Sequence, residues 1–288
     1  MNETGRLDVV VRFHDLTRIS DLERCIFSLV GQDYRPLHIN LVVQRFSEAD
    51  KDVVRSRLAP LLMGEQSPSL EILNWDHEAP VDARSALINM GIHASTGRYL
   101  AFLDFDHVLY PEAYRLLISQ LELTGTDLAF ARVRNVEVEV YDTFLRPKAV
   151  LPGAEGKGLH DLFRGNYFPI HSYVIDRSGI PEQFLFFDPN LTAEEDYDFL
   201  LRICAQFQSD FTLAQIEIGE CSMKTGDGNH RSAGGRKPMQ QAQDEHVAAF
   251  LEQRRRNTLL SQQVQRTLGV TLSRKDLTIR SLLDRELC

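Results

Sequence analysis

The sequence lacks the features that would place it in a membrane or make it depend on disulfide bonds. No run of about 18 apolar residues occurs, so no membrane-spanning helix is predicted. The first residues lack a long apolar segment followed by a small-residue cleavage site, so no secretory signal is expected there. The four cysteines are too few for a disulfide scaffold, and their spacing fits no zinc or redox motif. We therefore expect reduced thiols and a cytoplasmic protein.

Basic charge is also scarce. The 32 lysine and arginine residues face 41 aspartate and glutamate residues, which gives a net charge of −9. Binding to nucleic acid through its phosphates needs a basic face, so no nucleic-acid partner is expected. No G-x-G-x-x-G pattern follows a predicted strand, which argues against a dehydrogenase. Residues 12–20 contain no glycine, which argues against a nucleotidyltransferase with a glycine-rich loop after its first strand.

Strand-like and helix-like segments alternate over the first half of the chain. Apolar, β-branched runs predict strands, and amphipathic runs predict helices between them. The strands are expected at 7–13, 38–43, 69–75 and 98–103, and the helices at 21–32, 47–62, 82–95 and 111–124. This order is typical of a mostly parallel sheet with helices on both faces.

The pattern changes after residue 124. Two consecutive antiparallel strands are predicted first, at 127–134 and 136–144, and a loop over 146–160 follows. The remaining predictions are strands at 172–176 and 212–218, helices at 193–207, 238–268 and 275–286, and a loop at 224–238. We expect one domain over 1–235, with halves 1–110 and 111–235, and a helical extension over 236–288.

Two carboxylates leave the fourth predicted strand. Ligands bind at the carboxyl ends of the strands in an open α/β sheet, and Asp104 and Asp106 lie at such an end. Carboxylate oxygens suit Mg²⁺ or Mn²⁺, which take one or two carboxylates together with phosphate oxygens. The pair is a candidate metal site, and the alternative is a solvated turn.

Charged residues also mark two predicted helix starts. Arg84 opens the helix after the third strand, where a guanidinium and a helix N-terminus suit a diphosphate. Residues 194–198 contain four acids, which stabilise the positive end of a helix dipole. One of them is also a candidate general base if a crevice raises its pKa. Asp198 is expected either to cap the helix or to pair with Arg202, one turn further on.

The most specific pattern is a gap-free block around these carboxylates. It comprises Ala83-Arg84-Ser85-Ala86, then Gly91, then Ala94-Ser95-Thr96-Gly97-Arg98-Tyr99-Leu100-Ala101-Phe102-Leu103-Asp104-Phe105-Asp106-His107, then Pro111. Three shorter blocks accompany it: Ser28-Leu29 with Gln32-Asp33-Tyr34, residues 166–172, and residues 187–191 with 195–198. Together they resemble the family 2 glycosyltransferases of the GT-A fold, over roughly residues 7–230.

The resemblance implies an α/β, GT-A-type mixed sheet that binds a nucleotide and is flanked by helices. The half at 1–110 would bind the nucleotide sugar and the half at 111–235 the acceptor. The implied reaction is an inverting, metal-dependent transfer of a sugar from a nucleotide-diphosphate sugar to a hydroxyl of a carbohydrate or lipid-linked glycan. It would serve polysaccharide or glycoconjugate assembly and use Mn²⁺ or Mg²⁺. The alternative is a non-catalytic GT-A-like binding or scaffolding protein.

The resemblance also implies roles for individual residues. Asp196 is the expected general base, and Glu195 would orient it or contact the acceptor. The expected metal ligands are Asp106, Asp104 and His230. The expected donor-binding residues are Arg84, Asp104, Asp15, Asp76 and Lys224, with a loop at 224–232 as a lid. Because this site is acidic in an acidic protein, a diphosphate is expected to need a cation in order to bind.

The nucleotide-binding segments depart from the family pattern in several places. After the second strand, Gln44-Arg45-Phe46-Ser47 replaces the usual Asp-Asp-Gly-Ser, so Asp76 becomes the candidate for base recognition. The first strand ends in Arg12-Phe13-His14-Asp15, where the family has Pro-Thr-Tyr-Asn, so Asp15 takes the place of the asparagine. His107 replaces the third acid of the metal-binding block.

The polar C-terminal helix carries three adjacent arginines, Arg254–Arg256, beside an apolar seam. One interpretation is peripheral contact with anionic lipid at the inner face of a membrane. The other is packing on the domain, or on a second subunit in a homo-oligomer. The second interpretation is favoured, because three basic residues are a small cluster.

Overall fold

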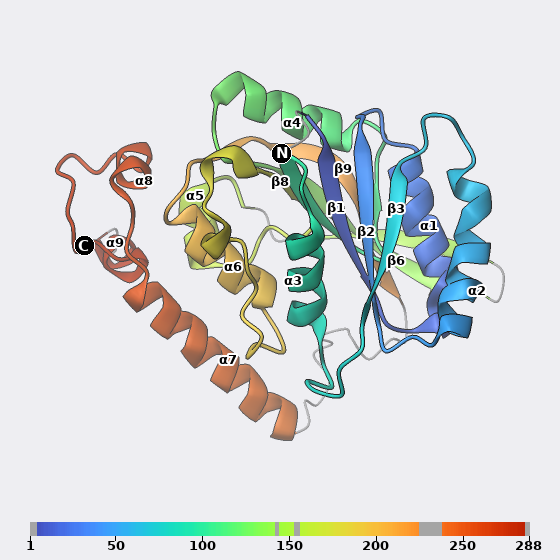
Figure 1. The fold of residues 1–288 in the computed structure, drawn as a ribbon. Coiled ribbons are helices and arrows are strands. Elements are labelled where there is room, and N and C mark those ends of the chain that lie inside the picture. Colours follow the sequence, from blue (N-terminus) through green and yellow to red (C-terminus); the bar gives the residue numbers. More distant parts are fainter. Residues whose placement is uncertain (1–4, 142–143, 153–155, 225–237, 286–288) are drawn as a thin grey trace.

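A computed structural model describes residues 5–141, 144–152, 156–224 and 238–285 (Figure 1). The strands are β1 (Leu7–Phe13), β2 (Leu37–Gln44), β3 (Ser69–Trp75), β4 (Tyr99–Asp104), β5 (Val108–Leu109), β6 (Leu128–Val140), β7 (Leu145–Leu151), β8 (Tyr173–Asp176) and β9 (Ser209–Lys224). The α-helices are α1 (Ile19–Val30), α2 (Glu48–Leu58), α3 (Arg84–Ala94), α4 (Ala113–Thr124), α5 (Leu159–Arg164), α6 (Glu195–Cys204), α7 (Pro238–Asn257), α8 (Gln262–Thr267) and α9 (Ile279–Arg285).

The described residues form one nine-stranded mixed sheet in the order β3-β2-β1-β4-β8-β6-β9-β5, with β7 paired to β6. The first four strands in this order are parallel, and β8 then runs antiparallel to β4. The predicted parallel half and its four strands are therefore confirmed. In the register between β1 and β4, Arg12 lies opposite Asp104, so the two side chains leave the sheet at the same edge.

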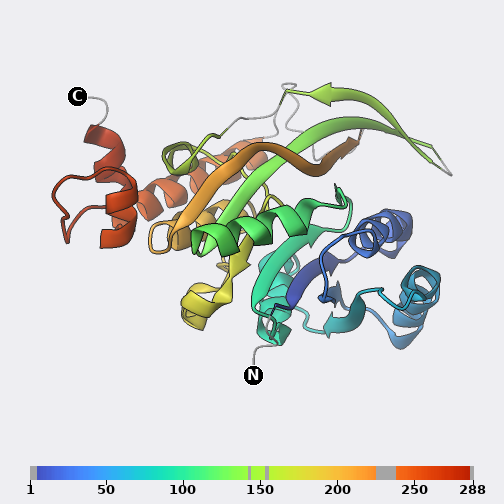
Figure 2. The same cartoon turned by 90° about the horizontal axis from the view of Figure 1, so that it is seen from above.

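Helices cover both faces of the sheet, as Figures 1 and 2 show. The alternate side chains of β1 and β4 enter two separate cores. Val10 and Phe102 pack in the core that also contains apolar residues of α3, α5 and α6. Val9 and Leu103 pack in the core that contains residues of α1, α2 and α4. Because both faces are buried, these strands are almost wholly apolar, as expected for parallel strands.

The second half of the sheet corrects two predictions. The segment at 127–144 is not two strands: β6 continues without a turn to Val140 and passes a register shift at Glu137. Its first part pairs antiparallel with β8, and residues 135–140 pair antiparallel with β7, most of which falls in the predicted loop at 146–160. Because of Pro147, this segment was predicted to be a loop rather than a strand. A proline is tolerated there because β7 lies at an edge and, among the described strands, pairs only with β6.

The C-terminal extension is also less continuous than predicted. The helix expected over 238–268 ends at Asn257, and α8 begins after Ser261, whose hydroxyl accepts a hydrogen bond from the amide of Val264. Figure 1 shows α7 running alongside α6, with α8 and α9 at its far end. Within the described ranges, no helix combines the length and the apolar character needed to cross a membrane.

Candidate functional site

A cleft of about 390 Å³ opens where β1, β2 and β4 end and α3 begins. This is the carboxyl edge of the parallel strands, where an open α/β sheet binds its ligands. The cleft is lined by Arg12, His14, Arg18, Gln44, Val81, Asp82, Arg84, Leu87, Asp104, Phe105 and Asp106. Three of the expected site residues therefore line one space: Arg84, Asp104 and Asp106.

Arg12 is the central side chain of this cleft. Its Nε donates to Oδ1 of Asp104 over 2.7 Å, and its Nη1 donates to Oε1 of Glu195 over 2.9 Å. Burial alone would raise the pKa of Asp104, but the guanidinium of Arg12 holds that pKa well below its usual range. Arg12 therefore keeps Asp104 ionised and links the end of β4 to the start of α6.

Arg18 makes the matching contact to the second carboxylate. It lies in the 3₁₀ turn Leu16–Arg18, and its Nη2 donates to Oδ2 of Asp106 over 2.8 Å. Its Nε donates to Oδ2 of Asp21 over 3.0 Å, and the guanidinium lies 4.6 Å from the centroid of the Phe105 ring. Ring and carboxylates together fix the orientation of this guanidinium.

A histidine pair lies behind Asp106. The ring of His107 lies 4.7 Å from that of the buried His171 and 3.2 Å, through Nε2, from Sγ of Cys221. Burial by itself lowers the pKa of His107, but Cys221 and the nearby carboxylates outweigh it and raise the pKa to about 10. Burial and the charge on His107 lower the pKa of His171 to about 3. The pair thus carries one positive charge near neutral pH.

The two expected catalytic acids begin α6. Glu195 is almost fully buried, and its Oε1 accepts a hydrogen bond from Arg12. Its other oxygen, Oε2, lies 3.9 Å from Nη1 of Arg84. Asp196 receives hydrogen bonds from its neighbour's amide, at 2.8 Å, and from the side chain of Asn166, at 3.4 Å. Burial and the negative charges of Glu195 and Glu194 raise the pKa of Asp196 to about 7. A carboxylate with that pKa can accept a proton near neutral pH.

The expected anion-binding arginine begins α3, as predicted. Nε of Arg84 donates to Oδ1 of Asp82 over 2.9 Å, and the two side chains are about two-fifths exposed. This is a partly solvated pair, so the guanidinium is able to turn toward a ligand in the cleft at small cost.

Three expected residues lie outside the lining of this cleft. Asp15 caps the 3₁₀ turn, where its carboxylate accepts hydrogen bonds from the amide and hydroxyl of Thr17. Asp76 is exposed beyond β3 and is absent from the cleft lining. Lys224 pairs with Asp21 and lines a neighbouring cleft of about 590 Å³. His230 lies outside the described residues, as does most of the loop expected to act as a lid.

Sequence reasoning missed both arginines that hold the carboxylates. Arg12 offered one signal, because it is the only charged residue after Asp8 in the apolar run that forms β1. A charge in a buried strand needs a partner, and the parallel register supplies Asp104. Arg18 offered none, because its neighbours Leu16, Thr17 and Ile19 look like an ordinary helix start.

The residues that the structure describes do not compose the expected cation site. They contain no group of three or more histidine, cysteine or acidic side chains arranged to hold a metal ion. One oxygen of Asp104 and one of Asp106 already form an ion pair with a guanidinium, and the positive charge of that guanidinium repels a dication. The described donors, which do not include His230, therefore do not fit a divalent ion in this arrangement.

The C-terminal extension contacts the helix that carries the acids. Arg254 donates to Oδ1 of the fully buried Asp198 over 2.6 Å, and Arg202 donates to its other oxygen over 2.9 Å. The predicted pair of Asp198 with Arg202 is therefore confirmed. Arg255 donates to the hydroxyl of Tyr197 over 2.9 Å. Two of the three adjacent arginines thus pack on the domain.

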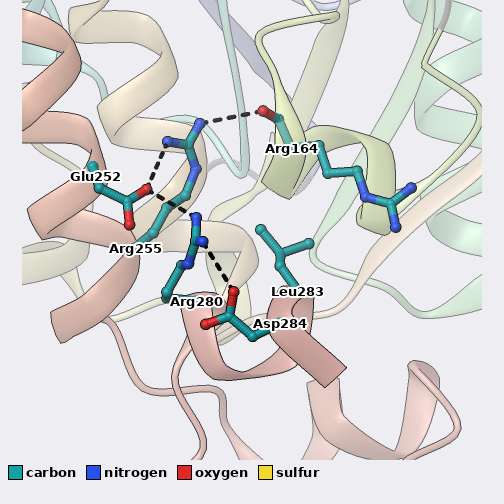
Figure 3. A pocket seen from close by; sticks show the side chains of 6 residues that line it. All are labelled: Arg164, Glu252, Arg255, Arg280, Leu283 and Asp284. Atoms are coloured by element: carbon teal, nitrogen blue, oxygen red, sulfur yellow. Dashed lines mark hydrogen bonds and ion pairs between the residues drawn. The ribbon is translucent and has the colours of Figure 1, made fainter. Parts of the chain in front are cut away.

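A further cavity of about 410 Å³ lies beside this contact, between α5, α7 and α9 (Figure 3). Its lining alternates in charge. Glu252 lies between Arg255 and Arg280, at 3.7 and 3.4 Å, and Arg280 lies 3.0 Å from Asp284. Within the extension the two arginines are matched by the two acids, and Arg164 of α5 adds a third guanidinium to the lining.

Comparisons with known proteins agree with this architecture. The sequence profile described as Glycosyl transferase family 2 matches residues 9–180. The uncharacterized glycosyltransferase YibD of Escherichia coli (strain K12) is 27% identical over 129 residues, which are 45% of this chain and 34% of that protein. The match thus spans about a third of the curated relative.

Solved structures share the fold at low sequence identity. S. aureus TarS 1-349 in complex with UDP-GlcNAc superposes with a TM-score of 0.62 and 13% identity, over 89% of this chain and 68% of that one. The mannosyltransferase PcManGT of Pyrobaculum calidifontis, in complex with GDP-Man and Mn²⁺, superposes with a TM-score of 0.54 and 11% identity, over 99% of this chain and 80% of that one. The fold is that of the GT-A glycosyltransferases. Since the profile spans more than half of its residues, the chain belongs to glycosyltransferase family 2.

Proposed function

We propose that the chain transfers a sugar from a nucleotide-diphosphate sugar to an acceptor hydroxyl, with inversion at the anomeric carbon. One observation carries the proposal. Arg12 connects Asp104, in the cleft at the carboxyl edge, to Glu195, which adjoins a carboxylate whose pKa is raised to about 7. This arrangement supports transfer of a group to a hydroxyl, because a carboxylate with that pKa beside a charged ligand cleft can accept the hydroxyl proton near neutral pH.

The cleft supplies the donor site in this proposal. TarS has been solved with UDP-GlcNAc and PcManGT with GDP-Man, which supports a nucleotide-diphosphate sugar as the class of donor. The diphosphate would lie near Arg84, at the N-terminus of α3, where helix dipole and guanidinium both favour an anion. Gln44 and His14 line the cleft and are available to the nucleoside.

The base would act on the acceptor. Asp196 takes the proton of the acceptor hydroxyl, and the oxygen attacks the anomeric carbon from the face opposite the diphosphate. The bond between that carbon and the phosphate oxygen breaks, and its electron pair leaves with the nucleoside diphosphate. Attack from the opposite face gives inversion and needs only this one base. Glu195, fixed by Arg12, holds the start of α6 in place.

The acceptor we propose is a carbohydrate or a lipid-linked glycan, and the process polysaccharide or glycoconjugate assembly. Membership of family 2 supports this assignment. The domain over 1–235 would carry the reaction, and the extension over 236–288 would support α6 through Arg254 and Arg255.

The test is a thermal-shift panel of UDP-, GDP-, dTDP- and CDP-sugars, each measured with excess EDTA and with Mn²⁺. A ligand at about 100 times its Kd adds roughly 2.7 kcal/mol to the folded state, which raises Tm by several degrees. The sugar that raises Tm is then assayed for release of nucleoside diphosphate. A scaffolding protein would release none, and a panel in which no sugar raises Tm would contradict the proposal.

Asp196→Asn separates binding from transfer. We expect the variant to keep the thermal shift and to lose transfer by roughly 10²–10⁴-fold, the usual contribution of a general base. Asp52→Asn is the matched control, because Asp52 is an exposed acid of α2 that pairs only with Arg55 among the described residues. Near-normal transfer by Asp196→Asn would refute the assignment of the base.

A further inference from the structure

The acidic residues of the cleft are already neutralised by residues of the chain. The lining contains three aspartates (Asp82, Asp104 and Asp106) and three arginines (Arg12, Arg18 and Arg84). Each aspartate lies within 3.0 Å of one of these arginines. Arg12 also pairs with Glu195 and Arg18 with Asp21, neither of which lines the cleft. Within the lining itself the positive and negative side chains are equal in number, so the expectation of a cation, which assumed an acidic lining, loses its basis there.

We propose that Arg12 and Arg18 perform the electrostatic role of a divalent cation in this protein, so that the nucleotide diphosphate binds without a metal. The inference rests on the proposed function, because it concerns the same donor. It differs from the expectation drawn from the family resemblance, in which Asp104 and Asp106 hold Mn²⁺ or Mg²⁺.

Both guanidinia are fixed but retain donors for an anion. Arg12 uses Nε and Nη1, and Arg18 uses Nε and Nη2, for the carboxylates. The remaining terminal nitrogen of each has no partner among the residues that the structure describes. Both side chains line the cleft and are about one-fifth exposed. Two oriented guanidinia with spare N–H groups suit the oxygens of a diphosphate.

Binding of a dication to the same carboxylates would carry a specific cost. It would compete with Arg12 and Arg18 for Asp104 and Asp106, at distances of 2.7 and 2.8 Å. The displaced guanidinia would stay in a partly buried cleft beside a like charge, which is unfavourable. The aromatic ring of Phe105 and the carboxylate of Asp21 also hold Arg18 where it is.

The experiment measures nucleotide binding rather than turnover. Isothermal titration of the full chain with UDP and with GDP is carried out in excess EDTA and in millimolar MnCl₂. For the nucleotide that binds, we expect Kd to differ by less than about threefold between the two conditions, well under the tenfold that 1.4 kcal/mol represents. Binding that occurs only with Mn²⁺ overturns the inference and leaves the proposed function standing. Absence of binding in both conditions overturns both.

Two variants test the residues. Arg18→Gln and Arg12→Gln should each weaken binding in EDTA by roughly tenfold or more, the loss expected for a charge-assisted contact. In Arg18→Gln, Asp106 loses its guanidinium, so Mn²⁺ should now strengthen binding by roughly tenfold. Arg57→Gln is the matched control, because Arg57 also makes two hydrogen bonds to one carboxylate, that of Glu23, and neither residue lines the cleft.

The comparison of wild-type nucleotide binding in EDTA and in MnCl₂ tests the inference even if a variant fails to fold. A folded Arg18→Gln variant that binds nucleotide in EDTA as tightly as Arg57→Gln would also overturn the inference.

Discussion

Arg12 and Asp104 are direct neighbours in the parallel register of β1 and β4, and Nε of the arginine lies 2.7 Å from Oδ1 of the aspartate. The backbone pairing of two strands thus sets a contact between a cation and an anion at the edge of the sheet. The contact is partly shielded from solvent, so Coulomb attraction there is stronger than at the surface. It stabilises the fold and shapes the ligand cleft at once.

Replacement of Arg12 by glutamine should destabilise the protein in a pH-dependent way. The change leaves Asp104 and Glu195 without their guanidinium, and we expect a loss of about 2 kcal/mol near neutral pH, a drop in Tm of roughly 4–8 °C. Arg12 lowers the pKa of Asp104, so its stabilisation is fully present above the ordinary aspartate pKa and declines as pH falls toward the depressed value. The difference in Tm between wild type and variant should therefore shrink between pH 7 and pH 3. A difference that is constant across this range would contradict the assignment.

Transfer should depend on pH through Asp196. The base acts only when ionised, so kcat should rise about tenfold per pH unit below its pKa and level off above about 7. Residual transfer by Asp196→Asn should lack this rise. The measurement is a pH–rate profile of both proteins between pH 5 and pH 9, with Asp52→Asn keeping the wild-type profile.

The same carboxylate should lower the stability of the folded state at high pH. Its pKa is raised on folding, so the folded state binds the proton more tightly than the unfolded state does. The loss of folding free energy that results from ionising Asp196 therefore grows as pH rises from the ordinary aspartate pKa to about 7. We therefore expect Asp196→Asn to melt higher than wild type at pH 8 and nearly equally at pH 4. A higher Tm by at least about 2 °C at pH 8 corresponds to roughly 1 kcal/mol in a chain of this size.

The parallel half of the fold was predictable because its residues carry local signals. The strands β1 and β3 have the predicted bounds, and Ser47, at the start of the helix predicted over 47–62, forms a capping box with Asp50. The antiparallel pair of β6 and β7 at the edge of the sheet was not predictable, because an exposed strand is defined by the strand it pairs with rather than by a pattern of buried apolar residues. The position of Asp104 and Asp106 followed from the end of β4. The arginines that hold these carboxylates could not be predicted in the same way, because Arg18 and Asp106 are 88 residues apart in the sequence.

Arg254 should matter more than Arg256, although the two are neighbours on α7. Arg254 pairs with the fully buried Asp198, whereas Arg256 is two-thirds exposed and lies 3.0 Å from Glu252 on its own helix. We expect Arg254→Gln to lose about 2 kcal/mol and Arg256→Gln less than about 0.5 kcal/mol. Because Asp198 lies two residues after Asp196, Arg254→Gln should also lower kcat more than it raises KM for the donor. Equal effects of the two changes on Tm would argue against a supporting role for the extension.

Gly91 should prove irreplaceable because α3 packs closely on β1 at this point. A Cβ added there would lie 2.3 and 2.9 Å from the two methyl groups of Val10. In an exposed helix, glycine to alanine gains about 1 kcal/mol from helix propensity, but here the overlap should reverse the sign and cost roughly 1–3 kcal/mol. Gly158→Ala is the control, since Gly158 has extended backbone and open space around its Cβ position.

The effect of Gly91→Ala should extend to the ligand. A helix displaced from β1 carries Arg84, its first residue, away from the cleft that Arg12 lines from the other side. Nucleotide binding should therefore weaken at temperatures where the variant is still folded, by roughly tenfold for the loss of one charge-assisted contact. Circular dichroism gives the melting curve, and titration well below Tm gives Kd. Unchanged Kd together with a lowered Tm would show that α3 tolerates displacement without moving Arg84, and that its close packing serves stability alone.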